Sequence, residues 1–240
     1  MVKISERLRT AAGLIGEGER LADVGTDHGY VPIYLVERKR IPSAIAMDIR
    51  TGPLERAREH IRMYGMEDYI QTRLSDGVAA LKPGETDTIL IAGMGGGLVI
   101  HILESGRVIC EQAHRLVLQP QSELPKVRRF LMENGYVTER EEMVMEDGKY
   151  YPMMRVHFDA SAVSHADSFT EEQELEFRYG KQLLTEKHPV LLAYLRWEVQ
   201  IQQDILTQLS GQPATEQIAA RIDAVKQILA QNARALAYYE

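Results

Sequence analysis

The sequence predicts an α/β protein in which a mainly parallel sheet is followed by a helical extension. Between residues 20 and 120, short apolar runs alternate with helical patterns, as in βαβ units. Two extended runs follow Gly135, and long helical stripes fill the last part of the chain. At 240 residues the chain can hold one moderate domain and an appendage. We expect the first domain over residues 1–160 and a helical domain over 161–240.

The elements of the sheet domain follow in order along the chain. Apolar residues at helical steps within residues 1–18 predict an amphipathic helix that covers the main domain. Pro53 suits the first turn of a later helix, because its missing N–H group is not needed there. We expect strands near residues 20–24, 44–48, 69–74, 87–92 and 115–119, and helices near 31–38, 53–63, 96–104 and 123–134.

After Gly135, residues 136–144 and 150–158 read as two strands joined by a turn at Glu146-Asp147-Gly148. Residues 161–170 have no periodicity, which indicates a linker, and a helix near 171–187 follows it. Gly211-Gln-Pro213 separates two longer apolar stripes and predicts an antiparallel helical hairpin that coils on itself or docks onto the first domain. The stripes are Tyr194, Trp197, Ile201, Ile205, Leu209 and Ile218, Ile222, Val225, Leu229, Leu236.

Composition limits the function classes. A net charge of −7 argues mildly against a nucleic-acid partner, because phosphate contacts normally supply most of that affinity; any RNA surface must be a local patch. Arg38-Lys-Arg40, the Arg56/Arg58/Arg62 helix face and Lys126/Arg128/Arg129 are candidates, although each also fits a solvated helix face. The single cysteine, Cys110, excludes an intrachain disulfide, and no run of about 20 apolar residues is present. We expect a soluble protein of the cytoplasm, without a metal site.

The loop Asp23-Val-Gly-Thr-Asp-His-Gly29 is the most informative segment. Gly25 and Gly29 lack a Cβ, so a ligand can approach the backbone closely. Carboxylates in such a loop disfavour a pyrophosphate. Asp23 and Asp27 instead suit a ligand that carries an ammonium and a sulfonium, which describes S-adenosylmethionine.

Two further acids follow the next strands. Asp48 ends the second strand, where a carboxylate can accept hydrogen bonds from both ribose hydroxyls of a nucleoside. Asp76-Gly77, after the third strand, would reach the adenine amine. The spacing of Asp48 suits a dinucleotide as well, and each acid alone could be a helix cap. Acids at three consecutive strand ends favour one shared crevice. We expect it to be lined by Asp23, Gly25, Thr26, Asp27, Gly29, Asp48, Ile49, Asp76, Gly77, Ala92, Gly93 and Met94.

The acceptor side of the site is predicted from three polar residues and a glycine turn. The turn, Ala92-Gly-Met-Gly-Gly-Gly97, ends the fourth strand and indicates a backbone that something approaches closely. His28 and Tyr30 open the first sheet helix and could stack on an acceptor base, or serve as a helix cap and a core aromatic. Gln119, at the end of the fifth strand, could hydrogen-bond a base edge. These three residues are the catalytic candidates.

Together, Asp23-Val-Gly-Thr-Asp-His-Gly-Tyr-Val-Pro32, Asp48 with Gly52-Pro-Leu54, Ile91-Ala-Gly-Met-Gly-Gly96 and Leu116-Val-Leu-Gln-Pro120 resemble the bacterial tRNA (adenine-22-N1)-methyltransferase family. The resemblance covers nearly the whole chain and implies a Rossmann-like class I methyltransferase fold with a C-terminal coiled coil that helps to hold tRNA. One departure is Gln121, where this family is expected to have Asn.

The resemblance implies transfer of a methyl group from S-adenosylmethionine to N1 of one adenine in the D-arm region of tRNA. Adenine N1 carries a lone pair, so no strong general base is expected. The expected partner is tRNA, with no membrane and no metal, and we expect a monomer. The alternatives are a methyltransferase of another substrate and a nucleotide-binding interaction module without activity.

Overall fold

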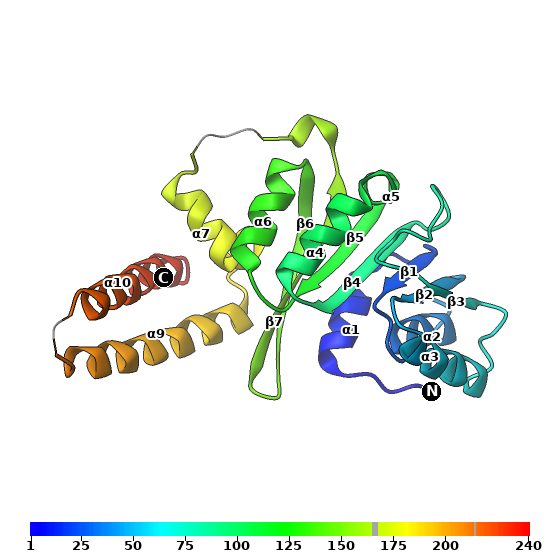
Figure 1. Cartoon of the computed structure of the whole chain (residues 1–240), viewed down its shortest axis with the longest axis horizontal. Coiled ribbons are helices and arrows are strands. Elements are labelled where there is room, and N and C mark those ends of the chain that lie inside the picture. Colours follow the sequence, from blue (N-terminus) through cyan, green and yellow to red (C-terminus); the bar gives the residue numbers. More distant parts are fainter. Residues whose placement is uncertain (165–167, 214) are drawn as a thin grey trace. The chain divides into compact units, whose positions relative to one another are not determined.

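A sheet of seven strands organises the first of two compact units, Met1–Ser168, in the computed structural model. The structure describes residues 1–164, 168–213 and 215–240. The strand order is β3-β2-β1-β4-β5-β7-β6, and β7 runs antiparallel to both of its neighbours (Figure 1). The strands are β1 (Leu21–Val24), β2 (Ala44–Asp48), β3 (Ile70–Leu74), β4 (Thr88–Met94), β5 (Arg115–Pro120), β6 (Tyr136–Glu146) and β7 (Lys149–Phe158).

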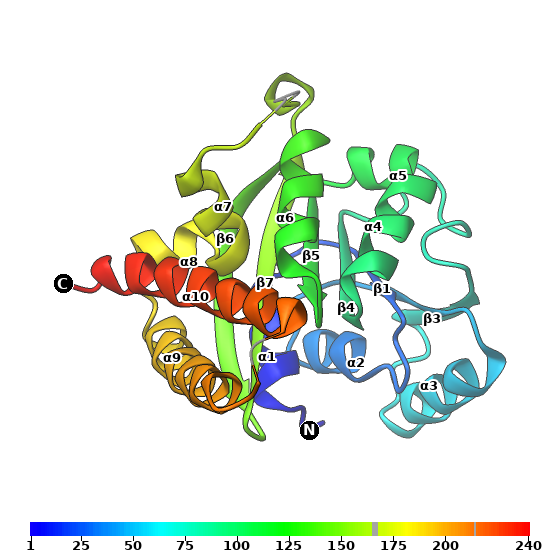
Figure 2. The same ribbon diagram turned by 60° about the vertical axis from the view of Figure 1, so that its left-hand side comes forward.

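Helices cover both faces of this sheet (Figure 2). Successive side chains of a strand point to opposite faces, so each strand contributes to two half-cores. In β1, Leu21 packs on the side of the first three helices, and Ala22 on the side of the next three. One layer is α1 (Glu6–Gly13), α2 (Tyr30–Glu37) and α3 (Thr51–Met63), and the other is α4 (Gly96–Ser105), α5 (Arg107–Gln112) and α6 (Leu124–Glu133).

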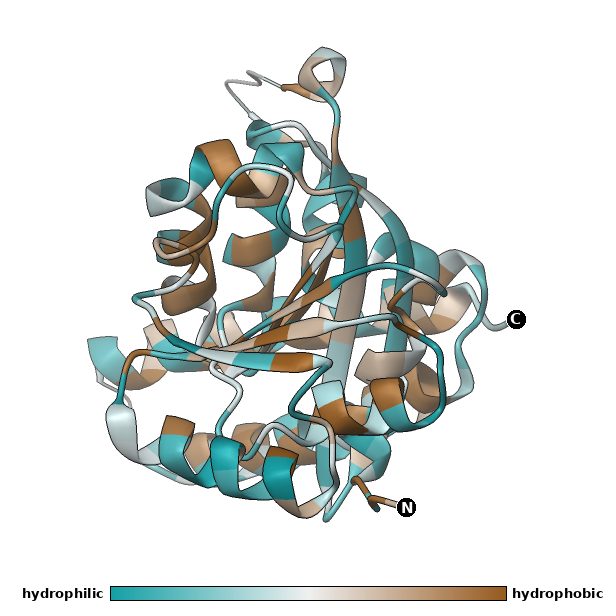
Figure 3. Cartoon of the chain, turned by 90° about the vertical axis from the view of Figure 1, so that its right-hand side faces the viewer, coloured by the Kyte–Doolittle hydropathy of each residue, from teal (hydrophilic) through white to brown (hydrophobic). Residues whose placement is uncertain are grey.

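Burial explains why the strands could be recognised. All residues of β1 and of β2 are buried, because helices cover both of their faces, and their sequences are therefore apolar almost throughout. Figure 3 shows the resulting distribution, with hydrophobic residues along the strands and hydrophilic ones along the outer sides of the helices. The α/β fold class and its seven expected strands are confirmed.

Local chemistry sets the ends of several elements. The turn between β6 and β7 is Asp147-Gly148, and both residues have positive φ, 49° and 72°, as a two-residue hairpin with this twist requires. Helix α1 is shorter than expected, since it begins where the Ser5 side chain accepts a hydrogen bond from the Leu8 backbone and ends before Leu14, which is buried. The short helix α5 was not predicted.

The second unit, Phe169–Glu240, is helical. The expected helix near residues 171–187 is divided into α7 (Glu171–Tyr179) and α8 (Lys181–Thr185), because Gly180 has a φ of 96°, which a continuous helix does not allow. Thr170 and Gln173 form a capping box at the start of α7. Part of the expected linker, residues 165–167, lies outside the described residues; a short 3₁₀ turn, η1 (Ala160–Ala162), precedes it.

The two longest helices, α9 (Pro189–Ser210) and α10 (Glu216–Ala237), form the predicted antiparallel hairpin. Asn232 Nδ2 donates to the Leu195 carbonyl (3.1 Å) and the Tyr239 hydroxyl to the His188 carbonyl (2.9 Å), which fixes the antiparallel register. The predicted stripe was wrong at Trp197 and Ile201, which are 48% and 38% exposed. The inward positions are instead Leu191, Leu195 and Glu198. A coiled-coil geometry stays a prediction.

Candidate functional site

The loop after β1 is held in an open conformation by glycines and by backbone hydrogen bonds. Gly25, Asp27 and Gly29 all have positive φ, of 73°, 50° and 70°. The backbone N–H groups of Gly25 and Thr26 both donate to the carbonyl of Met47, in the neighbouring strand β2. The loop is therefore anchored to the sheet on one side, and its other side is available to a ligand.

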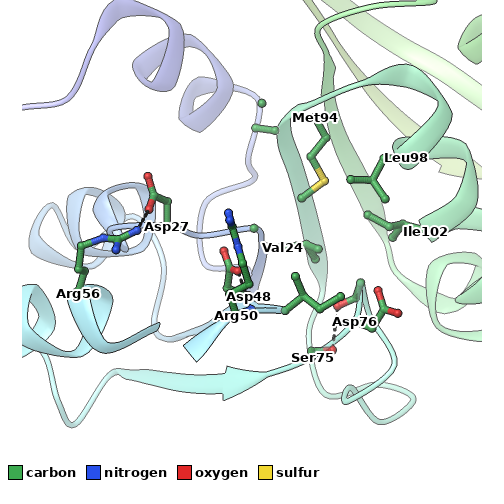
Figure 4. A pocket seen from close by; sticks show the side chains of 15 residues that line it. Val24, Asp27, Asp48, Arg50, Arg56, Ser75, Asp76, Met94, Leu98 and Ile102 are labelled. Carbon is green, nitrogen blue, oxygen red and sulfur yellow. Dashed lines mark hydrogen bonds and ion pairs between the residues drawn. The ribbon is translucent and has the colours of Figure 1, made fainter. Parts of the chain in front are cut away.

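A cavity of about 530 Å³ lies at the carboxyl ends of β1, β2, β3 and β4, as parallel sheets of this type commonly provide (Figure 4). Its acidic residues come from three consecutive strand ends. Asp48 is 7% exposed, and its Oδ1 accepts a hydrogen bond from the Arg50 backbone (3.0 Å). The side chain of Asp76 has no hydrogen bond or ion pair within the described part of the chain. We call this the larger cavity; it is lined by Val24, Gly25, Asp27, Asp48, Ile49, Arg50, Arg56, Ser75, Asp76, Gly77, Ala92, Gly93, Met94, Leu98 and Ile102.

A smaller cavity of about 280 Å³ adjoins the larger one, with which it shares Gly25, Asp27, Ala92 and Gly93. Helices α1 and α2 and the loop after β1 provide most of its wall. Its lining carries both acids and bases, together with an aromatic ring and an amide. The residues that belong to this cavity alone are Arg7, Leu8, Asp23, Thr26, His28, Tyr30, Val31, Leu90 and Gln121.

Strand alternation explains why Asp23 lies in the smaller cavity although Val24 lies in the larger one. Asp23 is 4% exposed, and its Oδ2 accepts a hydrogen bond from the Thr26 hydroxyl (2.6 Å). Burial raises the pKa of Asp23 to about 6, and the nearby charge of Asp48 acts in the same direction, whereas the hydrogen bond from Thr26 lowers the pKa. Asp23 is thus a buried carboxylate without a cationic partner in the described structure.

Replacing Asp23 by Asn is therefore expected to stabilise the protein near pH 7 by up to about 3 kcal/mol. The pKa of Asp23 is raised in the folded state from 3.8 to about 6, so wild-type stability falls as the pH rises from 4 to 6 and stays lower above that range. Urea unfolding of both proteins across this range measures the effect. The exposed variant Asp68→Asn serves as a control. If the gain in unfolding free energy of Asp23→Asn over wild type did not change with pH, the raised pKa of Asp23 would be contradicted.

Three aromatic rings stand together beside the smaller cavity. The rings of His28, Tyr30 and His60 are nearly parallel, with centroids 4.9 to 5.3 Å apart. His60, on α3, also places its Nδ1 3.0 Å from the carbonyl oxygen of His28. His28 and Tyr30 are only half-buried and line the cavity, so their rings are held in place and still accessible. The sequence did not single out His60.

The glycine turn after β4 is approached closely, but largely by the chain itself. The N–H groups of Gly96 and Gly97 donate to the side chains of Ser122 (3.2 Å) and Glu123 (3.0 Å), which occupy the start of α4. A Cβ on Gly96 would lie 2.5 Å from the Ser122 carbonyl oxygen. Only the first part of the turn, Ala92 to Met94, lines the cavities. Glu123 puts a carboxylate where a phosphate would have to bind.

Met94 and Gly25 meet at the boundary between the two cavities. A Cβ on Gly25 would overlap the terminal methyl group of Met94. Glycine at position 25 thus allows both the positive φ of the loop and the close approach of this side chain. Met94 is unbranched and flexible, so its tip can change position at this boundary.

Gln119 lies beneath the cavities and lines neither of them. Its side chain is 0% exposed, and its Oε1 accepts hydrogen bonds from Arg7 Nη1 (2.9 Å) and from the Gly93 backbone (3.2 Å). It supports the turn and α1 rather than presenting a free amide to a ligand. Gln121, two residues on, lines the smaller cavity instead.

Most residues that the sequence predicted for the site thus lie together at one edge of the sheet. Gly29 also lines neither cavity; a Cβ there would lie 3.4 Å from the Ala57 Cβ, so this glycine allows close packing against α3. Sequence reasoning missed Arg7 and Ser75, and it named Gln121 only as a departure from the Asn expected in the family. Within the described residues, no group of three or more His, Cys, Asp or Glu side chains is placed to hold a metal ion. None of the described helices has the length and apolar character that crossing a membrane requires.

Comparison with known proteins gives consistent results. A family model described as a methyltransferase domain matches residues 4–154. The tRNA (adenine(22)-N(1))-methyltransferase of Bacillus subtilis (strain 168) is 34% identical over 236 residues, which cover 95% of this chain and 98% of the relative. The crystal structure of the B. subtilis M1A22 tRNA methyltransferase TrmK has a TM-score of 0.82 at 32% identity, covering 98% of this chain and 99% of that one. The crystal structure of Sp1610 from Streptococcus pneumoniae, in complex with S-adenosyl-L-methionine, has a TM-score of 0.78 at 32% identity, covering 95% of this chain and 100% of that one.

Proposed function

This chain belongs to the bacterial tRNA (adenine(22)-N(1))-methyltransferase family, and we propose that its larger cavity binds the methyl donor and its smaller cavity the target adenosine. The protein is an S-adenosylmethionine-dependent methyltransferase whose product is 1-methyladenosine at position 22 of tRNA. One observation supports this division most directly. The two cavities adjoin at Gly25, Ala92 and Gly93, so ligands in both can meet there.

The residues of the larger cavity suit S-adenosylmethionine. Asp48 uses one carboxylate oxygen for the Arg50 backbone, which leaves the other for ribose hydroxyls. Asp76 is exposed and without a described partner, so it can accept a hydrogen bond from the adenine amine. No Lys lines this cavity within the described residues, and its two arginines, Arg50 and Arg56, stand among three carboxylates, Asp27, Asp48 and Asp76, which suits a cationic ligand.

The chemistry needs position more than proton transfer. S-adenosylmethionine supplies an electrophilic methyl group on a sulfonium, and adenine N1 has a lone pair to accept it. Because N1 lies on the Watson–Crick edge, the base must be unpaired or extruded, at a cost of a few kcal/mol. We propose that His28 and Tyr30 offset this cost by stacking on the base. The rings are already ordered by their contact with His60, so less order is lost on binding.

Asp23 has an electrostatic role in this proposal. Methylation at N1 leaves a positive charge on the base, and the Asp23 carboxylate lines the cavity that we assign to the base. A fixed negative charge next to a developing positive charge stabilises the transition state more than the neutral ground state. Burial of the Asp23 carboxylate lowers the stability of the fold, and its contribution to catalysis is then the reason that this cost is retained.

We also propose that the enzyme acts as a monomer in the cytoplasm. The acids, the aromatic rings and the glycine turn of the two cavities all come from residues 1–168, so one copy of this unit supplies every group to which the proposal gives a role in them. Light scattering of the purified protein measures its mass directly. A stable dimer would contradict this proposal.

The expected activity is methylation of tRNA by labelled S-adenosylmethionine, with 1-methyladenosine as the labelled nucleoside. A matched tRNA with guanine at position 22 should accept no label, because the acceptor nitrogen is then protonated. Labelled protein or metabolites in place of tRNA would favour a methyltransferase of another substrate. Donor binding without transfer to any of them would favour a regulatory module.

A further inference from the structure

Arg7 is the cation of the smaller cavity. Its Nη1 donates to Gln119 Oε1 (2.9 Å), and its guanidinium carbon lies 5.5 Å from the centre of the Tyr151 ring. Among the described residues that line this cavity, Arg7 is the one Lys or Arg. Its guanidinium has no other hydrogen bond or ion pair within the described chain, so most of its five N–H donors remain available.

The position of Arg7 is fixed from outside the cavity. Helix α1 carries Arg7 in its first turn, and Glu146, at the end of β6, accepts hydrogen bonds from the backbone N–H groups of Glu6 (2.6 Å) and Arg7 (3.4 Å). A carboxylate is favourable at the start of a helix. The β6–β7 hairpin therefore holds α1, and Gln119 and Tyr151 hold the guanidinium. A side chain restrained in this way loses little freedom when it binds a ligand.

Charge points to the kind of ligand. Asp23 and Asp27 line the same cavity, and Asp27 is already paired with Arg56 (2.8 Å). An extruded nucleotide brings its phosphate groups toward this acidic region, in a protein with a net charge of −7. Binding of the RNA strand thus depends on local cations of the protein. A guanidinium with free N–H donors matches a phosphate in geometry as well as in charge.

We infer that Arg7 binds a backbone phosphate next to the target adenosine and so positions the extruded base in the smaller cavity. This inference rests on the proposed tRNA substrate. It assigns to α1, which precedes β1 and the loop after it, a direct part in substrate binding. The Arg7 guanidinium and the Gly93 backbone both donate to Gln119 Oε1. Two hydrogen bonds therefore connect the proposed phosphate-binding group to the turn at the boundary between the cavities.

The test compares Arg7→Gln with Arg7→Lys and with Arg9→Gln. Arg9 lies on the same helix, is exposed and pairs with Glu6, so it is a matched control. For each protein, kcat/KM for tRNA is measured at several salt concentrations, and binding of S-adenosylhomocysteine is measured by calorimetry. We expect Arg7→Gln to lower kcat/KM for tRNA about tenfold or more. The slope of its logarithm against the logarithm of salt concentration should decrease by about one.

Arg7→Lys should recover part of the activity and the full salt slope, because it keeps the charge and loses the planar donor group. Arg9→Gln should behave as wild type. An unchanged salt slope in Arg7→Gln, or a loss explained entirely by weaker cofactor binding, would overturn the inference and leave Arg7 a structural support. Failure of the proposed function is distinguishable, because wild type itself would then not methylate tRNA.

Discussion

The variant Asp48→Ala should lose at least roughly 100-fold in affinity for S-adenosylmethionine while its sheet unit stays folded. Hydrogen bonds to a charged group contribute about 1.5–3 kcal/mol each, and Asp48 is placed to accept two from a ribose. The cost to the fold is small by comparison. Among the described residues, the side chain of Asp48 loses one hydrogen bond, from the Arg50 backbone, and its charge no longer adds to the effect of burial on the pKa of Asp23.

Calorimetric titration measures the affinity, and circular dichroism with urea unfolding measures the fold. The matched control is Asp68→Ala, an exposed acid in the same unit without a described side-chain partner. It should bind the donor as wild type does. Wild-type affinity in Asp48→Ala would remove Asp48 from the donor site and would leave the larger cavity without its central acid.

The sheet could be predicted from sequence because its central strands are buried on both faces and their apolar runs are nearly continuous. The helical unit was harder to predict for a physical reason. Trp197 and Ile201 continue a regular apolar stripe, yet the inward side of α9 carries a charged residue, Glu198, that no periodicity of apolar residues reveals. Helix α5 was missed because six residues are too few to show a stripe.

The site shows the same contrast. Acids at the ends of parallel strands must meet at one sheet edge, so Asp48 and Asp76 were predictable. Asp23 lies in the smaller cavity, apart from these two acids, because its side chain points to the opposite face of the sheet from that of Val24. The part played by Arg7 depends on its contact with Gln119 and Tyr151, residues more than a hundred positions away along the chain. Contacts of this kind leave no local pattern in the sequence.

The polar centre of the second unit leads to the other large expected effect. Glu198 is 5% exposed, and its two oxygens accept four hydrogen bonds from three helices. Arg178 Nη2 (2.8 Å) and the Tyr194 hydroxyl (3.0 Å) donate to Oε1, and the Tyr179 hydroxyl (2.8 Å) and Asn232 Nδ2 (2.9 Å) donate to Oε2. Burial and the charge of Glu198 raise the pKa of Tyr179, which therefore remains a donor.

Glu198→Ala should therefore lower the free energy of unfolding of the helical unit by about 3–5 kcal/mol, since it removes a buried carboxylate that accepts hydrogen bonds from a half-buried arginine and from three other donors. The chain has a single tryptophan, Trp197, adjacent to Glu198 on α9, so tryptophan fluorescence reports this unit selectively. The control Asp204→Ala removes an exposed acid from the same helix, whose one described hydrogen bond comes from Gln200, and should change stability by less than about 0.5 kcal/mol.

The outcome also separates two accounts of how the helices are held together. If apolar contacts such as those of Leu191 and Leu195 carried the hairpin, Glu198→Ala would cost about 1 kcal/mol or less, and burial of a carboxylate would be merely tolerated. If the network sets the register of α7, α9 and α10, the fluorescence transition should move to lower urea while binding of S-adenosylhomocysteine by the sheet unit persists. Loss of both together would contradict separate unfolding of the two units.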